Sequence, residues 1–184
     1  VFVASEKLDP ARLFFHAHLE LEPPAPAVME KPGRIVIFYD ASGSAEKRDR
    51  KQEIAFLEAW LKSLGNTKVD LVAFRNDADK PISFDVRDGD ASALRKALED
   101  LPLDGGTSLG AVNVADVPEA ELAVLVSDGF SNFGPSEPSL VRKDDRPVPL
   151  FAIHARQMEI GPNLVGFARK TGGRTINLIN MDRE

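Results

Sequence analysis

The sequence VIFYDASGS, Val36–Ser44, joins the end of an apolar run to three oxygen-bearing side chains. Residues 35–39 are apolar or aromatic without interruption, which is typical of a strand buried on both faces of a sheet. An acid, Asp40, ends the run, and Ser42 and Ser44 follow it at alternate positions. Because alternate side chains of an extended segment point the same way, these three oxygen-bearing side chains can face a single site.

Strands and helices alternate along the rest of the chain. Apolar runs predict strands, and apolar residues at helical spacing predict helices. The expected strands are 35–39, 69–74, 82–86, 122–127, 150–155 and 175–179, and the expected helices are 46–64, 92–101 and 163–170. Strands 69–74 and 82–86 are joined too closely for a crossover helix and should pair antiparallel. We therefore expect an α/β fold of the doubly wound, Rossmann-like kind, with a mostly parallel sheet and helices on both faces.

The first part of the chain differs from the rest. Residues 13–21 predict another strand, and the proline-rich segment 22–33 predicts an extended connector. We expect residues 1–32 to form an N-terminal strand and a connector, which together suit the tail of an upstream domain. Residues 33–184 should form the main domain. Few contacts need cross such a connector, so the main domain should fold without it.

Charge and composition exclude several classes of function. The 23 Lys and Arg residues are outnumbered by 29 Asp and Glu residues, which gives a net charge of -6 and argues against nucleic acid or an anionic membrane as the main partner. There is no cysteine, so disulfides and thiolate metal sites are excluded. No apolar run approaches the roughly 20 residues of a membrane-spanning helix.

Three loops carry the chemistry: DASGS at 40–44, DGGTSLG at 104–110 and SDGFSNFG at 127–134. The first and third follow apolar strands, and ligands of an open parallel sheet bind beyond the carboxyl ends of its strands. If those two strands are neighbours, Asp40 and Asp128 converge, and Thr107 adds a hydroxyl from a glycine-rich loop. Hard oxygen ligands without His or Cys suit Mg²⁺, Mn²⁺ or Ca²⁺ and disfavour zinc.

The order of these loops resembles the von Willebrand factor A domain over about residues 33–180, and the loops resemble its metal-ion-dependent adhesion site. The resemblance implies a six-stranded sheet with 82–86 as its antiparallel edge strand. It also implies a complete set of metal ligands, which by position are Asp40, Ser42, Ser44, Thr107 and Asp128. The long helix that the family has after its threonine loop is missing here, because residues 108–121 leave room for only a short one.

The implied function is a protein-binding module without catalytic residues. A divalent cation, Mg²⁺ foremost and Mn²⁺ or Ca²⁺ otherwise, would bridge the domain to a Glu or Asp carboxylate of a protein partner. The resemblance favours an extracytoplasmic or cell-envelope location. Two alternatives stay open: a metal-assisted hydrolase, and a structural domain whose metal site is unused. No general base is evident in the loops, and Ser42 does not lie in a G-x-S-x-G elbow, so we expect no enzyme.

Several features have two interpretations. The three side chains of the first loop could cap the next helix. The run EKRDRK, 46–51, is either the solvated start of that helix or a basic rim for an acidic partner. Phe130 and Phe133 either pack the third loop down or anchor a partner. His16 and His18 are expected to face solvent, His154 to lie in the core, and DVRDGD, 85–90, to form a turn and a helix cap.

Overall fold

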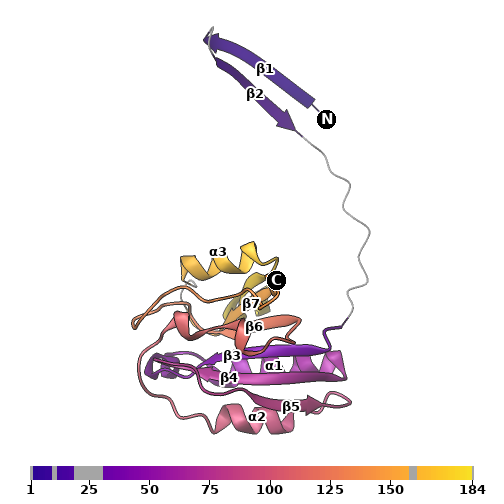
Figure 1. The fold of residues 1–184 in the computed structure, drawn as a ribbon, viewed down its shortest axis with the longest axis vertical. Coiled ribbons are helices and arrows are strands. Elements are labelled where there is room, and N and C mark those ends of the chain that lie inside the picture. The colour runs from indigo at the N-terminus through magenta and orange to yellow at the C-terminus, as the bar shows by residue number, and fades with distance from the viewer. Residues whose placement is uncertain (1, 10–11, 19–30, 158–160, 184) are drawn as a thin grey trace. The chain divides into compact units, whose positions relative to one another are not determined.

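The structure is a computed structural model, and it describes residues 2–9, 12–18, 31–157 and 161–183. It divides into two units, residues 1–30 and 31–184. The first unit contains an antiparallel hairpin of β1 (Phe2–Asp9) and β2 (Arg12–His18) (Figure 1). β2 accounts for the described part of the strand expected at 13–21, whereas β1 was not predicted. Residues 19–30, which hold most of the expected connector, lie outside the described residues.

The second unit is built on a six-stranded sheet with the order β5-β4-β3-β6-β7-β8 (Figure 1). β5 is antiparallel to β4, and all other neighbours are parallel, which confirms the expected fold class. β4 lies on one side of β3 and β6 on the other, so the strand order reverses there, and ligand sites of such sheets form at that point. The strands are β3 (Arg34–Asp40), β4 (Thr67–Phe74), β5 (Ile82–Val86), β6 (Leu122–Val126), β7 (Leu150–His154) and β8 (Arg174–Asn177).

The first helix begins later than the sequence predicts. The Asp49 side chain accepts a hydrogen bond from the Gln52 N–H at 3.0 Å and caps α1, so the helix starts at residue 50 instead of 46. The intervening residues form the short 3₁₀ helix η1 (Gly43–Lys47). The α-helices are α1 (Arg50–Leu64), α2 (Ser92–Glu99) and α3 (Pro162–Lys170), and η4 (Leu178–Arg183) follows the last strand.

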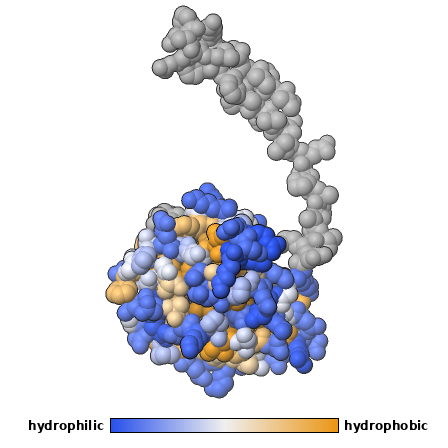
Figure 2. All heavy atoms as spheres, viewed as in Figure 1, coloured by the Kyte–Doolittle hydropathy of each residue, from blue (hydrophilic) through white to orange (hydrophobic). Residues whose placement is uncertain are grey.

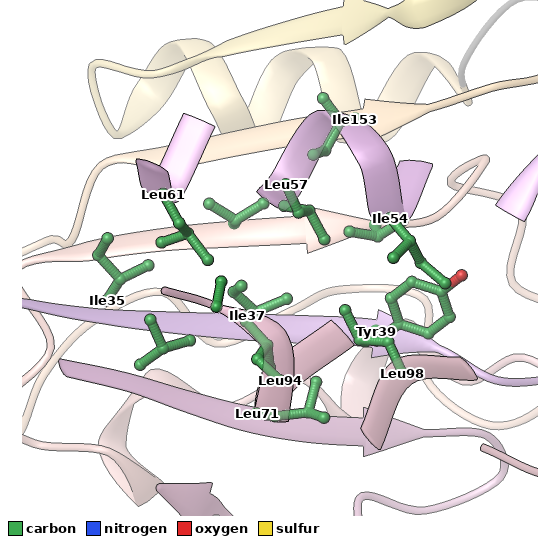
Figure 3. Close-up of a cluster of buried hydrophobic side chains, with 14 of the residues drawn as sticks. Ile35, Ile37, Tyr39, Ile54, Leu57, Leu61, Leu71, Leu94, Leu98 and Ile153 are labelled. Atoms are coloured by element: carbon green, nitrogen blue, oxygen red, sulfur yellow. The ribbon is translucent and has the colours of Figure 1, made fainter. Parts of the chain in front are cut away.

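The sheet is buried on both faces, as the uninterrupted apolar run of β3 predicts. Ile35, Ile37 and Tyr39 point to one face, where Leu57 of α1 and Leu94 of α2 pack against them (Figure 3). The residues between them, Val36 and Phe38, point to the opposite face. Each of these five β3 side chains is at most 1% exposed, so the strand is fixed from both sides, and so is the acid that ends it.

The second face is covered by α3 and by irregular chain instead of a long helix. Leu164 of α3 packs there with Val112 and Val114, which precede or begin the short 3₁₀ turn η3 (Val114–Asp116). The backbone of Val112 and Val114 exchanges hydrogen bonds with Ser139, at 2.8 and 2.9 Å, as two strands would. The expected short helix at 108–121 is therefore replaced by two 3₁₀ turns, η2 (Leu109–Ala111) and η3, because its valines alternate as in an extended segment.

The surface of this unit is mainly hydrophilic on the side shown in Figure 2, with hydrophobic residues in small groups. The large hydrophobic side chains with most exposure in the described residues are Ile82, Phe130, Phe133, Val141 and Met181. Within the described ranges, no helix combines the length and the apolar character that a membrane span requires.

Candidate functional site

The three loops predicted to converge do so at the carboxyl ends of β3 and β6. Gly43 donates its N–H to the Gly105 carbonyl at 3.1 Å, which ties the first loop to the second. The N–H groups of Asn132 and Phe133 both donate to the Thr107 carbonyl, at 3.0 and 3.1 Å, which ties the third loop to the second. A Cβ atom on Gly106 would lie 2.9 Å from the Asn132 side chain. Glycine at 106 therefore lets the second and third loops approach closely.

The hydroxyl groups of the first two loops form a continuous chain. The Ser42 Oγ atom lies 3.0 Å from Ser44 Oγ and accepts a hydrogen bond from Thr107 Oγ1 at 2.8 Å. Neighbouring ligands of an octahedral Mg²⁺, each about 2.1 Å from the ion, are about 3.0 Å apart. The spacing of the three hydroxyl oxygens thus fits adjacent corners of a hard cation's coordination shell. Ser42 makes no side-chain cap to η1, and Asp49 caps α1, so the capping interpretation of the first loop is wrong.

Asp40 is buried and almost fully occupied by hydrogen bonds. Its Oδ1 atom accepts the Ser42 N–H at 3.1 Å, its Oδ2 atom accepts the Ser127 hydroxyl at 2.8 Å, and Arg48 lies 3.3 Å from Oδ2. A carboxylate offers about four lone-pair positions, so one remains for a further ligand. Asp40, which the sequence places in a loop, instead ends β3 with 0% exposure. Removal of its side chain would therefore disturb the fold as well as the site.

Arg48 belongs to the site and not to a surface rim. Its side chain is 0% exposed and donates to the Asp40 carbonyl at 2.7 Å and to Glu53 Oε1 at 3.0 Å. Burial alone would lower the pKa of Arg48, but the negative charges of Glu53 and Asp40 outweigh burial and raise it. The basic-rim and solvated-helix interpretations both fail for this residue, although Lys47 and Lys51 on either side of it are exposed.

Glu53 connects Arg48 to the frame of the domain. Its Oε1 atom accepts the Ala155 N–H at 3.1 Å, and its Oε2 atom accepts the Tyr39 hydroxyl at 3.1 Å. Burial raises the pKa of Glu53, and the attraction of Arg48 opposes that rise only in part. Burial likewise raises the pKa of Tyr39, which keeps its hydroxyl a donor. One buried network therefore joins α1, β3 and the end of β7.

Asp128 is held by two different partners. Its Oδ1 atom accepts the Phe130 N–H at 3.2 Å, and its Oδ2 atom lies 2.6 Å from the Arg156 guanidinium. The charge of Asp128 also contributes to the raised pKa of Arg48, after those of Glu53 and Asp40. Both carboxylates of the predicted site thus help to stabilise the positive charge of Arg48.

Three side chains of this site were not predicted as part of it: Arg48, which was expected on the surface, Arg156 and Ser127. Only Ser127 had a usable signal, because it directly precedes Asp128 in the third loop. The arginines have none, since each reaches its carboxylate only after folding. In the described residues, no three His, Cys, Asp or Glu side chains gather as metal ligands, so a metal here would depend on the hydroxyl groups as well.

The structure also bears on the two aromatic residues of the third loop, on the segment DVRDGD and on the histidines. Phe130 and Phe133 are 46% and 52% exposed, so they do not pack the third loop down. In DVRDGD, the positive φ of Asp88 and Gly89 confirms the turn. The Asp90 side chain accepts the Ser92 N–H at the start of α2, but the N-cap residue of that helix is Ala91. His16 and His18 lie on β2, but their side chains are outside the described part of the structure.

His154 is 1% exposed at the end of β7, which confirms its core position. Burial lowers its pKa, and the charge of Asp128 opposes this only in part. A lowered pKa means that His154 stabilises the fold fully above about pH 6.5, the pKa of an unfolded histidine, and that this contribution is lost as the pH falls through the lower folded value.

We therefore expect the stability of wild type and His154→Leu to diverge with pH. The free energy of unfolding of wild type should fall more steeply between pH 7.5 and 5 than that of the variant, because leucine cannot take up a proton. Urea titrations of both proteins at pH 7.5 and pH 5 measure how much the free energy of unfolding of each changes with pH. Parallel pH profiles would show that His154 is not held neutral by the fold.

Comparison with known proteins finds the fold but no close sequence relative. No protein-family model matches the sequence, and no curated protein matches it significantly. An aerotolerance-related membrane protein from Bacteroides fragilis superposes with a TM-score of 0.58 at 14% identity, covering 82% of this chain and 97% of that one. BatB from Bacteroides thetaiotaomicron gives 0.55 at 12%, with 82% and 93% covered.

A von Willebrand factor type A protein from Catenulispora acidiphila gives a TM-score of 0.55 at 18% identity. The alignment covers 82% of this chain but only 40% of that chain. The domain described here therefore has a fold like that of the von Willebrand factor A domain. At these identities the likeness concerns the fold and not the ligand of the site.

Proposed function

We propose that this chain is a protein-binding module that holds a divalent cation, Mg²⁺ foremost, among Asp40, Ser42, Ser44, Thr107 and Asp128. The observation that carries the proposal is the contact of three hydroxyl groups from two loops, with Ser42 Oγ 3.0 Å from Ser44 and 2.8 Å from Thr107. Neutral hydroxyl groups add ligand oxygens without adding negative charge. A cation bound there would keep much of its attraction for an external carboxylate.

The charges around the site support an acidic ligand. Asp40 faces Arg48 and Asp128 faces Arg156, so each carboxylate already has a positive partner. A divalent cation added to these paired charges would make the surroundings of the site more positive, which a Glu or Asp of a protein partner can balance. Phe130 and Phe133, both exposed on the third loop, would supply apolar contacts beside that carboxylate.

Binding fits the site better than catalysis does. A hydrolase would need a free base beside the metal, and the carboxylates of Asp40, Asp128 and Glu53 are each paired with an arginine. The fold likeness to a membrane protein related to aerotolerance accords with a location at the cell envelope, which we propose for this chain as well.

The first test is metal binding by the chain alone. Mg²⁺, Mn²⁺ or Ca²⁺ should raise the melting temperature of wild type, because a ligand that binds only the folded state stabilises it. Thr107→Val keeps the shape of the side chain but removes one ligand oxygen, so its metal affinity should fall by about tenfold or more, as second-sphere and ligand losses commonly do. Isothermal titration and thermal scans measure both effects.

Thr175→Val is the matched control, because it removes a hydroxyl from β8, two strands away from β6. Its metal affinity should equal that of wild type. Equal metal responses of wild type and Thr107→Val would exclude Thr107 as a ligand, and no response of wild type to any of the three cations would favour a structural domain with an unused site.

A further inference from the structure

Arg156 holds one oxygen of a carboxylate that would help to bind the cation. Its guanidinium lies 2.6 Å from Asp128 Oδ2, and the other oxygen, Oδ1, already accepts the Phe130 N–H at 3.2 Å. Arg156 follows β7, whose carboxyl end lies beside that of β6 in the sheet. It therefore reaches Asp128 from the adjacent strand, at the same edge as the three loops.

The two arginines of the site differ in how firmly they are held. The Arg48 side chain is 0% exposed and is fixed by Glu53 and by the Asp40 carbonyl, so it has no path to solvent. The Arg156 side chain is 25% exposed, whereas the Asp128 side chain beneath it is 3% exposed. The Arg156 guanidinium can therefore rotate outward and contact water in place of the Asp128 carboxylate. The Asp128 side chain cannot reach solvent in this way.

We propose that Arg156 is a tethered competitor of the metal for Asp128. This inference rests on the proposed function. A guanidinium and a divalent cation on the same carboxylate repel each other, so binding of the cation to Asp128 weakens the contact with Arg156 and favours its movement toward solvent. The ion pair compensates the buried charge of Asp128 before metal arrives, and it sets how much free cation is needed to fill the site. Arg156 is thereby a residue that determines metal affinity without being a ligand.

The test compares the metal affinity of four proteins by isothermal titration with Mn²⁺ and Mg²⁺, without any partner. Arg156→Gln removes the competing charge and should bind metal about tenfold more tightly or better, as expected when a like charge is removed beside an ionic site. Arg156→Lys keeps the charge and should stay near wild type. Arg146→Gln, which removes an exposed arginine paired with Asp144, should also match wild type.

Thermal scans give a second readout that does not depend on tight binding. Without metal, Arg156→Gln should melt below wild type, because Asp128 is left buried without its partner. Saturating metal should raise its melting temperature by more than it raises that of wild type, since the cation replaces the lost charge. The nitrogen NMR signal of Arg156 Nε in wild type should also shift on addition of Mg²⁺.

Each outcome separates this inference from the proposed function. Metal binding by wild type with equal or weaker affinity in Arg156→Gln would overturn the competition and leave the metal site standing. Binding by Arg156→Gln alone would support the competition and show that the guanidinium keeps metal out of wild type. Failure of both proteins to bind any of the cations would overturn both proposals.

Discussion

Arg48→Met should lower the free energy of unfolding by about 3–5 kcal/mol, because removing one member of a buried ion pair leaves its partners buried without compensation. The Arg48 side chain is 0% exposed and lies 3.0 Å from Glu53 and 3.3 Å from Asp40, so two carboxylates would lose their positive neighbour at once. For a domain of this size the loss corresponds to a fall of about 10 °C in melting temperature. Urea titration and calorimetry at pH 7.5 measure it.

The control for this variant is Arg146→Met, which shortens another arginine by the same atoms. Arg146 is 72% exposed and pairs with Asp144 on the surface, where such pairs contribute little. Its stability should stay close to that of wild type. If the free energy of unfolding of Arg48→Met also equalled that of wild type, the carboxylates of Asp40 and Glu53 would have to be protonated or hydrated in the fold. Arg48 would then not be the charge that compensates them.

Binding of a protein partner should disappear when the metal is removed. A partner isolated by affinity capture in Mg²⁺ should dissociate in EDTA, because its carboxylate would lose the cation that holds it. Thr107→Val should lose most of this binding while it keeps its fold, since valine fills the same space. Asp40→Ala is a poorer choice, because Asp40 is buried and faces Arg48.

Two further variants define what the partner contacts. Phe130→Ser should weaken binding without changing metal affinity, because Phe130 is 46% exposed beside the site. Lys47→Gln tests whether an exposed positive charge steers the acidic partner toward the site, which the buried Arg48 cannot do. This variant should mainly slow association at low salt. A partner that binds equally well in EDTA and to Thr107→Val would place the recognition surface away from the metal site.

The sequence was most informative where a pattern reports directly on burial. The apolar run of β3 predicted the buried sheet, the acids at the ends of β3 and β6 predicted the site edge, and the short connection between β4 and β5 predicted their antiparallel pairing. Periodicity failed for residues 108–121, because spacing alone does not show that Val112 and Val114 pair with Ser139, which lies far along the chain. It failed for the start of α1, expected at residue 46, because the helix is capped by Asp49 and not by a side chain of the first loop.

Which charged side chains face the site could not be predicted from the sequence, for a different reason. The run at 46–51 consists of six charged residues, and nothing in their order marks Arg48 as the one that faces inward. Its direction is set by partners on three elements: Asp40 on β3, Glu53 on α1 and, through Glu53, Ala155 after β7. Such long-range pairs become visible only in the folded chain.

Neither edge of the sheet invites a further strand. At one edge, β8 has only four residues and follows Gly172 and Gly173, and at the other, β5 begins directly after Pro81 and exposes Asp85. Short edges with proline and charge resist β-augmentation and open-ended stacking of copies. These edges therefore disfavour capture of a peptide backbone, and the proposed partner would be bound by the side chains at the ends of the strands.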